Sequence, residues 1–229
     1  MSTPPKSIRA VVFDAYGTLF NVHSVVETCE LLFPGKGGTL SQLWRSKQLE
    51  YSWLRSLMGR YVDFNQVTRE SLQFACESLG LPFSDLAVTR LNDAYRRLAL
   101  FDDTLPVLQQ LQHSLPLVKR AILSNGATEM LNAVVTHNNI GKFFDAVISA
   151  DEIGIFKPAP SVYQLCSDRL GVAPSEIAFV SSNGWDAAGA KAFGFTTFWI
   201  NRPSGPVEQL GVKPDQLLKS LAELLDQIG

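Results

Sequence analysis

Short apolar segments alternate with longer amphipathic segments along most of the chain. The apolar segments have the length of β-strands, are rich in β-branched and aromatic residues and are mostly apolar at every position, which is typical of strands buried on both faces. The segments between them repeat apolar residues at helical spacing. We expect strands at Ile8–Phe13, Val118–Leu123, Ala146–Ser149, Ile177–Val180 and Thr196–Ile200. We expect helices at Thr104–Leu115, Thr128–Asn138, Ser161–Leu170 and Asp186–Phe193.

This alternation predicts an α/β fold, a Rossmann-like, doubly wound parallel sheet built from βαβ units. The segment Asp215–Ile228 at the end of the chain also carries apolar residues at helical intervals, so we expect it to be a helix that covers one edge or face of the sheet. The apolar positions of this expected helix are Leu217, Leu221, Leu224, Leu225 and Ile228.

The interval from residue 21 to residue 100 departs from the alternation, because it contains several amphipathic segments and no convincing strand. Ligands of open α/β sheets bind beyond the carboxyl ends of the strands, so a helical insertion that leaves the first strand would cover the ligand site. We therefore predict a core domain of residues 1–20 and 101–229 and an all-helical cap of residues 21–100. The cap helices are expected at Ser24–Phe33, Leu40–Met58, Gln66–Leu79 and Ser84–Leu98, with breaks at Gly35–Gly38 and Gly80–Pro82.

The composition restricts the possible partners. Hydrophobic residues make up 46% of the chain and charged residues 18%, which favours a folded globular protein over a disordered one. The net charge of −2 provides no broad cationic surface for nucleic acid or an anionic membrane. No apolar run approaches the ~18 residues of a membrane span, and the N-terminal residues lack the apolar stretch of a secretory leader. The three cysteines lie far apart without a Cys-x-x-Cys motif. We therefore expect a cytoplasmic protein that has no disulfide or zinc site and binds neither nucleic acid nor membrane.

Polar clusters follow the first, second and fourth expected strands, and a lysine lies in the loop after the third. The carboxyl ends of parallel strands meet at one edge of the sheet, so these residues should converge. One polar residue at a strand end is usually a turn former or a helix cap, but four such positions at one edge favour a site. The segments are Asp14-Ala15-Tyr16-Gly17-Thr18, Ser124-Asn125-Gly126, Lys157-Pro158 and Ser181-Ser182-Asn183-Gly184-Trp185-Asp186.

These motifs resemble those of the haloacid dehalogenase superfamily, and in particular its L-2-haloacid dehalogenase branch. Asp-x-Tyr-Gly-Thr at residues 14–18 and Ser-Asn-Gly-Trp-Asp at residues 182–186 are the specific signals, and residues 43–45 and 48–51 of the cap also match that branch. The resemblance covers nearly the whole chain. It implies a hydrolase acting on carbon–halide bonds, which converts L-2-haloalkanoic acids to D-2-hydroxyalkanoic acids and halide through an ester on the enzyme. It also implies a homodimer; the apolar residues of 40–58 either supply its interface or are buried within the cap.

Asp14 is the candidate nucleophile. An aspartate ordinarily has a pKa of about 3.9 and is an anion at neutral pH, so its attack requires no base. Lys157 would keep Asp14 ionised and pair with the substrate carboxylate. Ser124 and Asn125 would donate hydrogen bonds, and backbone N–H groups ahead of the helix at Thr128 could join them in an anion-binding turn.

The residue two positions after Asp14 argues against a metal-dependent phosphatase. Phosphatases of the superfamily carry a second aspartate there and further acidic residues on the fourth loop, which hold Mg²⁺, whereas this chain has Tyr16 and Ser182-Asn183. Phosphoryl transfer depends on neutralising charge, and Mg²⁺ requires several oxygen ligands. A departing halide carries one negative charge, which N–H donors can accept. We therefore expect neither a metal nor another cofactor. The alternatives are a Mg²⁺-dependent small-molecule phosphatase and a catalytically silent small-acid-binding protein.

The resemblance implies that Arg45, in the cap, binds the departing halide with help from Asn125 and Trp185. Leu49 and Phe64 either form an apolar wall around the alkyl group of the substrate or belong to the core. The preferred chain length and halogen are not readable from these motifs, because the volume of the pocket depends on how the cap helices pack.

The resemblance also implies that Asp186 orients or deprotonates the water that hydrolyses the ester. Tyr163 would orient Asp186 or Lys157, or is a packing residue. The remaining polar residues would hold the carboxylates and the developing oxyanion. The predicted catalytic residues are Asp14, Thr18, Arg45, Ser124, Lys157, Tyr163, Ser181, Asn183 and Asp186. The predicted substrate- and halide-binding residues are Tyr16, Arg45, Leu49, Phe64, Ser124, Asn125, Lys157 and Trp185.

Overall fold

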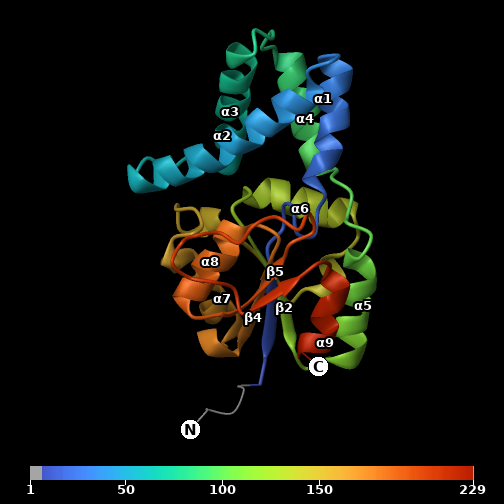
Figure 1. Cartoon of the computed structure of the whole chain (residues 1–229), viewed down its shortest axis with the longest axis vertical. Helices are drawn as coiled ribbons and strands as arrows, with labels where there is room; N and C mark the ends of the chain where they lie inside the picture. The colour runs from blue at the N-terminus through green and yellow to red at the C-terminus, as the bar shows by residue number, and fades with distance from the viewer. Residues whose placement is uncertain (1–6, 229) are drawn as a thin grey trace.

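The computed structural model describes residues 7–228 and shows one six-stranded sheet with the strand order β3-β2-β1-β4-β5-β6 (Figure 1). All neighbouring strands are parallel, and the first strand lies in the middle of the sheet. The predicted doubly wound α/β fold is therefore confirmed. The expectation for residues 1–6, that they contain no secretory leader, lies outside the described residues. The strands are β1 (Ala10–Phe13), β2 (Lys119–Ser124), β3 (Ala146–Ser149), β4 (Ile177–Ser181), β5 (Thr196–Ile200) and β6 (Gln216–Leu218).

Helices cover both faces of the sheet, because the central strands carry apolar residues on both faces that must be buried. Every residue of β1 is fully buried, as its uniformly apolar sequence predicts. Figure 1 shows α7 and α8 on one side of the sheet and α5 and α9 on the other. These helices are α5 (Thr104–Ser114), α6 (Thr128–His137), α7 (Pro160–Leu170), α8 (Gly184–Phe193) and α9 (Leu225–Ile228). Short 3₁₀ helices are η1 (Val22–Ser24), η2 (Gly141–Phe143), η3 (Ala150–Glu152), η4 (Pro174–Glu176) and η5 (Leu221–Leu224).

Four helices between β1 and α5 gather beyond one end of the sheet (Figure 1), and we call them the cap helices. They pack on one another through a shared apolar interior that includes Leu40, Trp44, Leu72 and Leu91, all fully buried. As expected, residues 21–100 contain no strand. No helix within residues 7–228 has the length and hydropathy that crossing a bilayer requires. The cap helices are α1 (Val25–Leu32), α2 (Gly37–Leu57), α3 (Phe64–Ser78) and α4 (Asp85–Arg96).

The prediction of one helix over residues 215–228 is wrong, because this segment begins with a strand. Gln216–Leu218 pairs with the outer side of β5, and helical structure starts only at Leu221. The Asp215 carboxylate accepts hydrogen bonds from the N–H and the hydroxyl of Thr197, at 2.8 and 3.2 Å, which sets the next residues beside β5. The unpaired backbone of β5 provides hydrogen bonds that the leucine spacing does not reveal. Leu217, which the spacing placed in the apolar stripe, is 50% exposed.

The predicted break at Gly35–Gly38 extends too far, because α2 already begins at Gly37. The Glu30 carboxylate accepts hydrogen bonds from the N–H groups of Gly35 and Gly37. It thereby satisfies backbone donors at the start of α2 that have no partner within the helix. A Cβ atom at Gly37 would lie 2.4 Å from the Glu30 backbone nitrogen, so this close approach requires glycine.

Candidate active site

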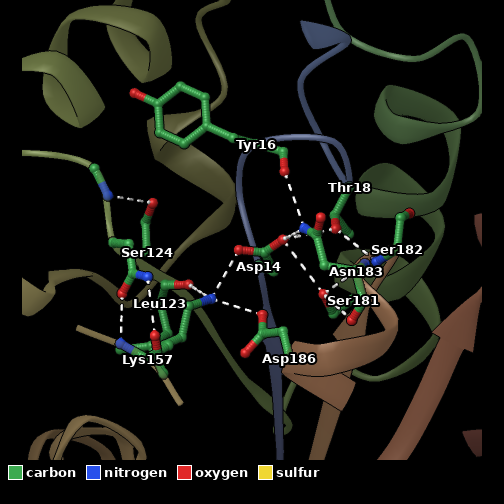
Figure 2. Close-up of polar contacts among 12 residues, drawn as sticks. Asp14, Tyr16, Thr18, Leu123, Ser124, Lys157, Ser181, Ser182, Asn183 and Asp186 are labelled. Atoms are coloured by element: carbon green, nitrogen blue, oxygen red, sulfur yellow. Dashed lines mark hydrogen bonds and ion pairs between the residues drawn. The ribbon is translucent and has the colours of Figure 1, made fainter. Parts of the chain in front are cut away.

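The polar clusters after β1, β2 and β4 meet at the carboxyl edge of the sheet, as the sequence predicts. The strands are in register there, with Phe13 beside Ile122 on one side and Val180 on the other. The Asp14 N–H donates to the Val180 carbonyl at 2.9 Å, which continues the ladder one residue beyond β1. Asp14 is therefore held at the centre of the cluster (Figure 2).

The Asp14 carboxylate is 5% exposed and its two oxygens have unequal surroundings. Oδ1 accepts one hydrogen bond, from Lys157 Nζ at 2.8 Å. Oδ2 accepts from Asn183 Nδ2 at 2.8 Å, Thr18 Oγ1 at 3.0 Å and Ser181 Oγ at 3.3 Å. The four donors satisfy a charge whose burial would otherwise be costly. Oδ1 is the less occupied oxygen.

Lys157 bridges two buried carboxylates, as Figure 2 shows. Its Nζ lies 2.8 Å from Asp14 Oδ1, 2.7 Å from Asp186 Oδ2 and 3.0 Å from the Leu123 carbonyl. Burial alone would lower the pKa of Lys157, but the two carboxylates overcome this effect and raise it. Asn125 positions the loop, because its Oδ1 accepts from the Lys157 N–H at 2.7 Å. Lys157 is therefore a fixed cation at the centre of the site.

Asp186, in the first turn of α8, is fully buried behind Lys157. Its Oδ1 accepts a hydrogen bond from the Tyr163 hydroxyl at 2.8 Å, and its Oδ2 accepts from Lys157. Burial raises the pKa of Asp186 to about 6, although Lys157 opposes this shift. Burial and the neighbouring Asp186 raise the pKa of Tyr163, so its hydroxyl remains a donor. Tyr163 lies where an orienting role for Asp186 requires it.

A small cavity of about 20 Å³ adjoins Asp14, enough for roughly one water molecule. The cap helices supply part of its wall through Arg45 and Leu49 of α2 and Phe64 of α3. A substrate can therefore enter only if the cap helices or these side chains move. The cavity is lined by Asp14, Tyr16, Arg45, Leu49, Phe64, Ser124, Asn125, Gly126, Lys157, Asn183 and Trp185.

Three groups on the cavity wall can bind an acceptor. Arg45 makes no ion pair with any residue in the described range 7–228. The Tyr16 hydroxyl and the Trp185 indole nitrogen are buried without a hydrogen-bond partner. Burial raises the pKa of Tyr16, so its hydroxyl stays protonated. Buried donors are normally satisfied, so these groups fit a site that receives an anion.

The predicted site residues thus form two sets. Ten of them line the cavity: Asp14, Tyr16, Arg45, Leu49, Phe64, Ser124, Asn125, Lys157, Asn183 and Trp185. The other four lie behind it: Thr18 and Ser181 donate to Asp14, Asp186 accepts from Lys157, and Tyr163 donates to Asp186.

Gly126 also lines the cavity, although the motifs placed it only in the Ser124-Asn125-Gly126 cluster and not among the predicted site residues. A Cβ atom at this position would lie 2.5 Å from Cε2 of the Tyr16 ring. The ring therefore packs directly against the backbone, and a larger residue would push it into the cavity. The signal in the sequence was a glycine directly after Ser124-Asn125 at a strand end, since glycine lets another group pack closely against the backbone.

Two of the backbone N–H groups near Thr128 are not available for the expected anion-binding turn. The Gly126 N–H donates to Ser124 Oγ at 3.0 Å, and the Thr128 N–H donates to Asp151 Oδ2 at 2.7 Å. Both donors are therefore engaged within the protein. Ser124 accepts through its oxygen and keeps its own O–H for a ligand.

Trp44 and Gln48 belong to the matching cap motif but point away from the cavity. Both are fully buried, and the Trp44 indole donates to the Thr68 carbonyl at 2.9 Å. The Gln48 amide donates to Thr68 Oγ1 at 3.1 Å and accepts from the Tyr95 hydroxyl at 3.1 Å. These residues bind the cap helices to one another, so only Arg45 and Leu49 of this motif reach the cavity.

The donor set of the site suits a metal ion poorly. The described residues contain no group of three or more histidine, cysteine, aspartate and glutamate side chains that could hold one. The two nearby carboxylates, Asp14 and Asp186, share the Lys157 ammonium between them. A Mg²⁺ ion bridging these carboxylates would meet that positive charge.

Comparison with known proteins places this fold and site in one family. The family model of haloacid dehalogenase-like hydrolases matches residues 8–194. The chain therefore belongs to the haloacid dehalogenase-like hydrolase family, which confirms the resemblance found in the motifs.

Its similar relatives are dehalogenases. An (S)-2-haloacid dehalogenase of Pseudomonas putida is 46% identical over 220 residues, which cover 96% of each chain. A haloacetate dehalogenase of Moraxella sp. (strain B) is 43% identical over 92% of this chain and 93% of its own. The solved L-2-haloacid dehalogenase of Xanthobacter autotrophicus with chloropropionic acid covalently bound has a TM-score of 0.90 and is 43% identical, covering 96% of this chain and 98% of its own.

Proposed function

We propose that this protein hydrolyses L-2-haloalkanoic acids to D-2-hydroxyalkanoic acids and halide. One observation carries the proposal: the buried Asp14, with one carboxylate oxygen bonded only to Lys157, lines the same small cavity as Arg45, which has no ion-pair partner among the described residues. Relatives over nearly the full chain that are (S)-2-haloacid dehalogenases support it. So does the covalent chloropropionic acid in the Xanthobacter protein.

In the first step, Asp14 Oδ1 attacks C2 from the side opposite the halogen. The new C2–O bond forms as the carbon–halogen bond breaks, and the bonding electrons leave with the halide toward Arg45, Asn125 and Trp185. Configuration at C2 is inverted. The enzyme then holds an ester on Asp14, and no base takes part in this step.

Substrate orientation follows from the donors around the cavity. The Ser124 O–H, whose oxygen already accepts the Gly126 N–H, can donate to the substrate carboxylate. Lys157 supplies positive charge next to it. Tyr16 lies on the same wall with a free hydroxyl, and Leu49 and Phe64 face the alkyl group.

In the second step, water attacks the Asp14 carboxyl carbon and the acyl–oxygen bond breaks. The product therefore leaves with Oδ1 as its hydroxyl oxygen. The negative charge of the intermediate develops on Oδ2, where Thr18, Ser181 and Asn183 already donate. Asp186 accepts a proton of the attacking water and passes it to the departing alkoxide, which leaves as the hydroxyl group of the product; the raised pKa of Asp186 makes its carboxylate a stronger base.

The deciding experiment is halide release and product chirality with the purified protein on L- and D-2-chloropropionate. We expect chloride and D-lactate from the L enantiomer alone. A silent binding protein would bind the acid without releasing chloride. A phosphatase would instead hydrolyse phosphate esters and require Mg²⁺.

We also propose that residues 21–100 form a cap domain over a core of residues 1–20 and 101–229, and that two chains associate through the cap. The C-terminal part of α2 leaves Leu54 and Met58 exposed by 44% and 64%. Burial of this apolar surface would stabilise a homodimer. Light scattering after gel filtration tests this: a dimer is expected for the unmodified protein and a monomer for Met58→Asp.

We propose a cytoplasmic location as well. Cys29, Cys76 and Cys166 are free and buried, which suits a reducing compartment. Fractionation of cells that produce the protein checks this, since recovery outside the cytoplasm would contradict it.

A further inference from the structure

A second cavity shares Trp185 with the cavity at Asp14, which we call the reaction cavity. It is an open groove of about 440 Å³ between the C-terminal part of α2, the loop before α7, the first turn of α8 and the segment between β5 and β6. Figure 1 shows this part of α2 extending beyond α3 on the side of the core that carries α7 and α8. The lining is nearly all apolar: Trp53, Ser56, Leu57, Ile155, Phe156, Pro158, Ala159, Trp185 and Leu210.

Aromatic side chains separate the groove from the reaction cavity. Trp185 lines both spaces, and its ring meets Trp53 edge to face with centroids 5.3 Å apart. The ring of Phe64, which lines the cavity, meets the ring of Phe156, which lines the groove, edge to face with centroids 5.9 Å apart. Neither the Trp53 nor the Trp185 indole nitrogen has a hydrogen-bond partner among residues 7–228. Packing alone holds both indoles, so Trp185 can swing aside without breaking a hydrogen bond.

One face of α2 runs from the proposed halide site to the groove. Arg45, Leu49, Trp53 and Leu57 follow one another at four-residue intervals, so they lie on the same side of the helix. Arg45 and Leu49 line the reaction cavity, and Trp53 and Leu57 line the groove. A substrate whose halogen faces Arg45 and whose carboxylate faces Ser124 and Lys157 has only the apolar wall left for the rest of its alkyl chain. That wall ends at Trp185.

We propose that the groove binds the alkyl chain of longer 2-haloalkanoic acids and that Trp185 sets the chain-length limit of the enzyme. This inference rests on the proposed dehalogenase function. The reaction cavity itself has no space for more than a short chain, whereas the groove begins at the shared Trp185 and is apolar, so burial of methylene groups there is favourable. Trp185 thus determines specificity in addition to its place at the halide site.

The test compares kcat/KM for (S)-2-bromooctanoate and (S)-2-bromopropionate by bromide release. The ratio of the two values isolates the alkyl chain, because both substrates carry the same halogen and any loss of halide binding affects both. Trp185→Leu should raise the octanoate-to-propionate ratio by about tenfold or more, the discrimination that pocket shape commonly provides. Trp185→Phe is the matched control, since it keeps an aromatic ring in the wall and should change the ratio much less.

A second variant fills the groove without touching the reaction cavity. Ala159 lines only the groove, so Ala159→Phe should lower the ratio in the unmodified protein. Combined with Trp185→Leu, it should reverse the gain. These results would support a groove that receives the alkyl chain.

Two outcomes overturn the proposal: equal effects of Trp185→Leu on both acids, or a ratio that Ala159→Phe leaves unchanged. If Trp185→Leu does not fold, Ala159→Phe alone decides. Absence of bromide release from (S)-2-bromopropionate by the unmodified protein would overturn the proposed function itself, and the groove proposal with it. The short substrate therefore distinguishes the two failures.

Discussion

The Lys157 ammonium donates a hydrogen bond to Asp14 Oδ1 at 2.8 Å, with the two side chains 1% and 7% exposed. A carboxylate buried without a cation would take up a proton and lose its ability to attack carbon. The pair therefore allows an anionic nucleophile to exist in a small, buried cavity. This relationship leads to the first prediction.

Lys157→Met should leave the carboxylates of Asp14 and Asp186 buried without their cation. We expect the free energy of unfolding at pH 7 to fall by about 3–5 kcal/mol, the usual cost of removing one partner of a buried ion pair. Urea denaturation measures the loss. The matched control is Lys191→Met, whose pair with Asp215 has side chains 36% and 33% exposed and should cost under about 1 kcal/mol. Equal losses in the two variants would contradict the central position given to Lys157.

Asp14→Asn keeps the shape of the side chain and removes the nucleophile. Halide release from L-2-chloropropionate should fall by about 10³-fold or more, as for other nucleophile substitutions. In the unmodified protein, a single turnover in ¹⁸O-water should place the label in the Asp14 carboxylate and leave the first product hydroxyl unlabelled. Mass spectrometry of the Asp14 peptide checks this. Label found directly in the hydroxy acid would mean that water, and not Asp14, attacks C2.

The buried Asp186, with its pKa raised from 3.8 to about 6, should make activity depend on pH. Its carboxylate form is needed for the second step, so ester hydrolysis should slow as the pH falls below about 6 while alkylation of Asp14 continues. Rapid-quench experiments at pH 5 should therefore show a burst of halide followed by a slow steady rate. Asp186→Asn should show the same burst at every pH. If Asp186→Asn showed no slow steady rate after the burst, Asp186 would be excluded as the proton acceptor.

Asp186 should also affect stability, with a sign opposite to that of an ordinary salt-bridged aspartate. Between pH 3.8 and about 6 the folded protein keeps a proton that the unfolded chain has lost. The contribution of Asp186 to the free energy of unfolding therefore decreases as the pH rises through this window. Comparing urea denaturation of the unmodified protein and Asp186→Asn from pH 4 to 7 isolates the contribution, because the variant lacks the titrating group. An equal pH slope for both proteins would contradict the raised pKa.

Arg45→Gln should weaken stabilisation of the leaving halide. We expect kcat for 2-chloropropionate to fall by about 10²-fold, the usual cost of losing one donor to developing charge. The loss should be smaller for 2-bromopropionate, because bromide is the better leaving group and needs less help. Arg55→Gln on the same helix is the control, since Arg55 pairs with Glu70 away from the cavity. Equal losses with both halogens would indicate that Arg45 only supports the packing of the cap.

Dialysis against EDTA should leave halide release unchanged, and added Mg²⁺ should not increase it. The reason is the Lys157 ammonium, which already neutralises Asp14 and Asp186. Initial rates with and without chelator measure this. Loss of activity that Mg²⁺ restores would favour the phosphatase alternative.

Local pattern in the sequence determined the strands of the central sheet, most of the helices and the presence of Asp14, Lys157 and Asn183 at one edge. The physical reason is that uniformly apolar strands must be buried on both faces, and parallel strands bring their carboxyl ends together. Helix starts with a local cap were also predictable, as at Ser84, whose side chain accepts from the Ala87 N–H at 3.2 Å.

Only the tertiary structure decided where distant segments meet. The strand β6 exists because Asp215 and the open edge of β5 provide hydrogen bonds that override a leucine spacing typical of helices. The motif residues Arg45 and Gln48 lie three positions apart, yet one reaches the cavity and the other binds Thr68 inside the cap. Which side of a helix meets the sheet, and how much volume remains between them, depends on the packing of residues far apart in the chain. For that reason the small cavity at Asp14 and the groove at Trp185 could not be read from the sequence alone.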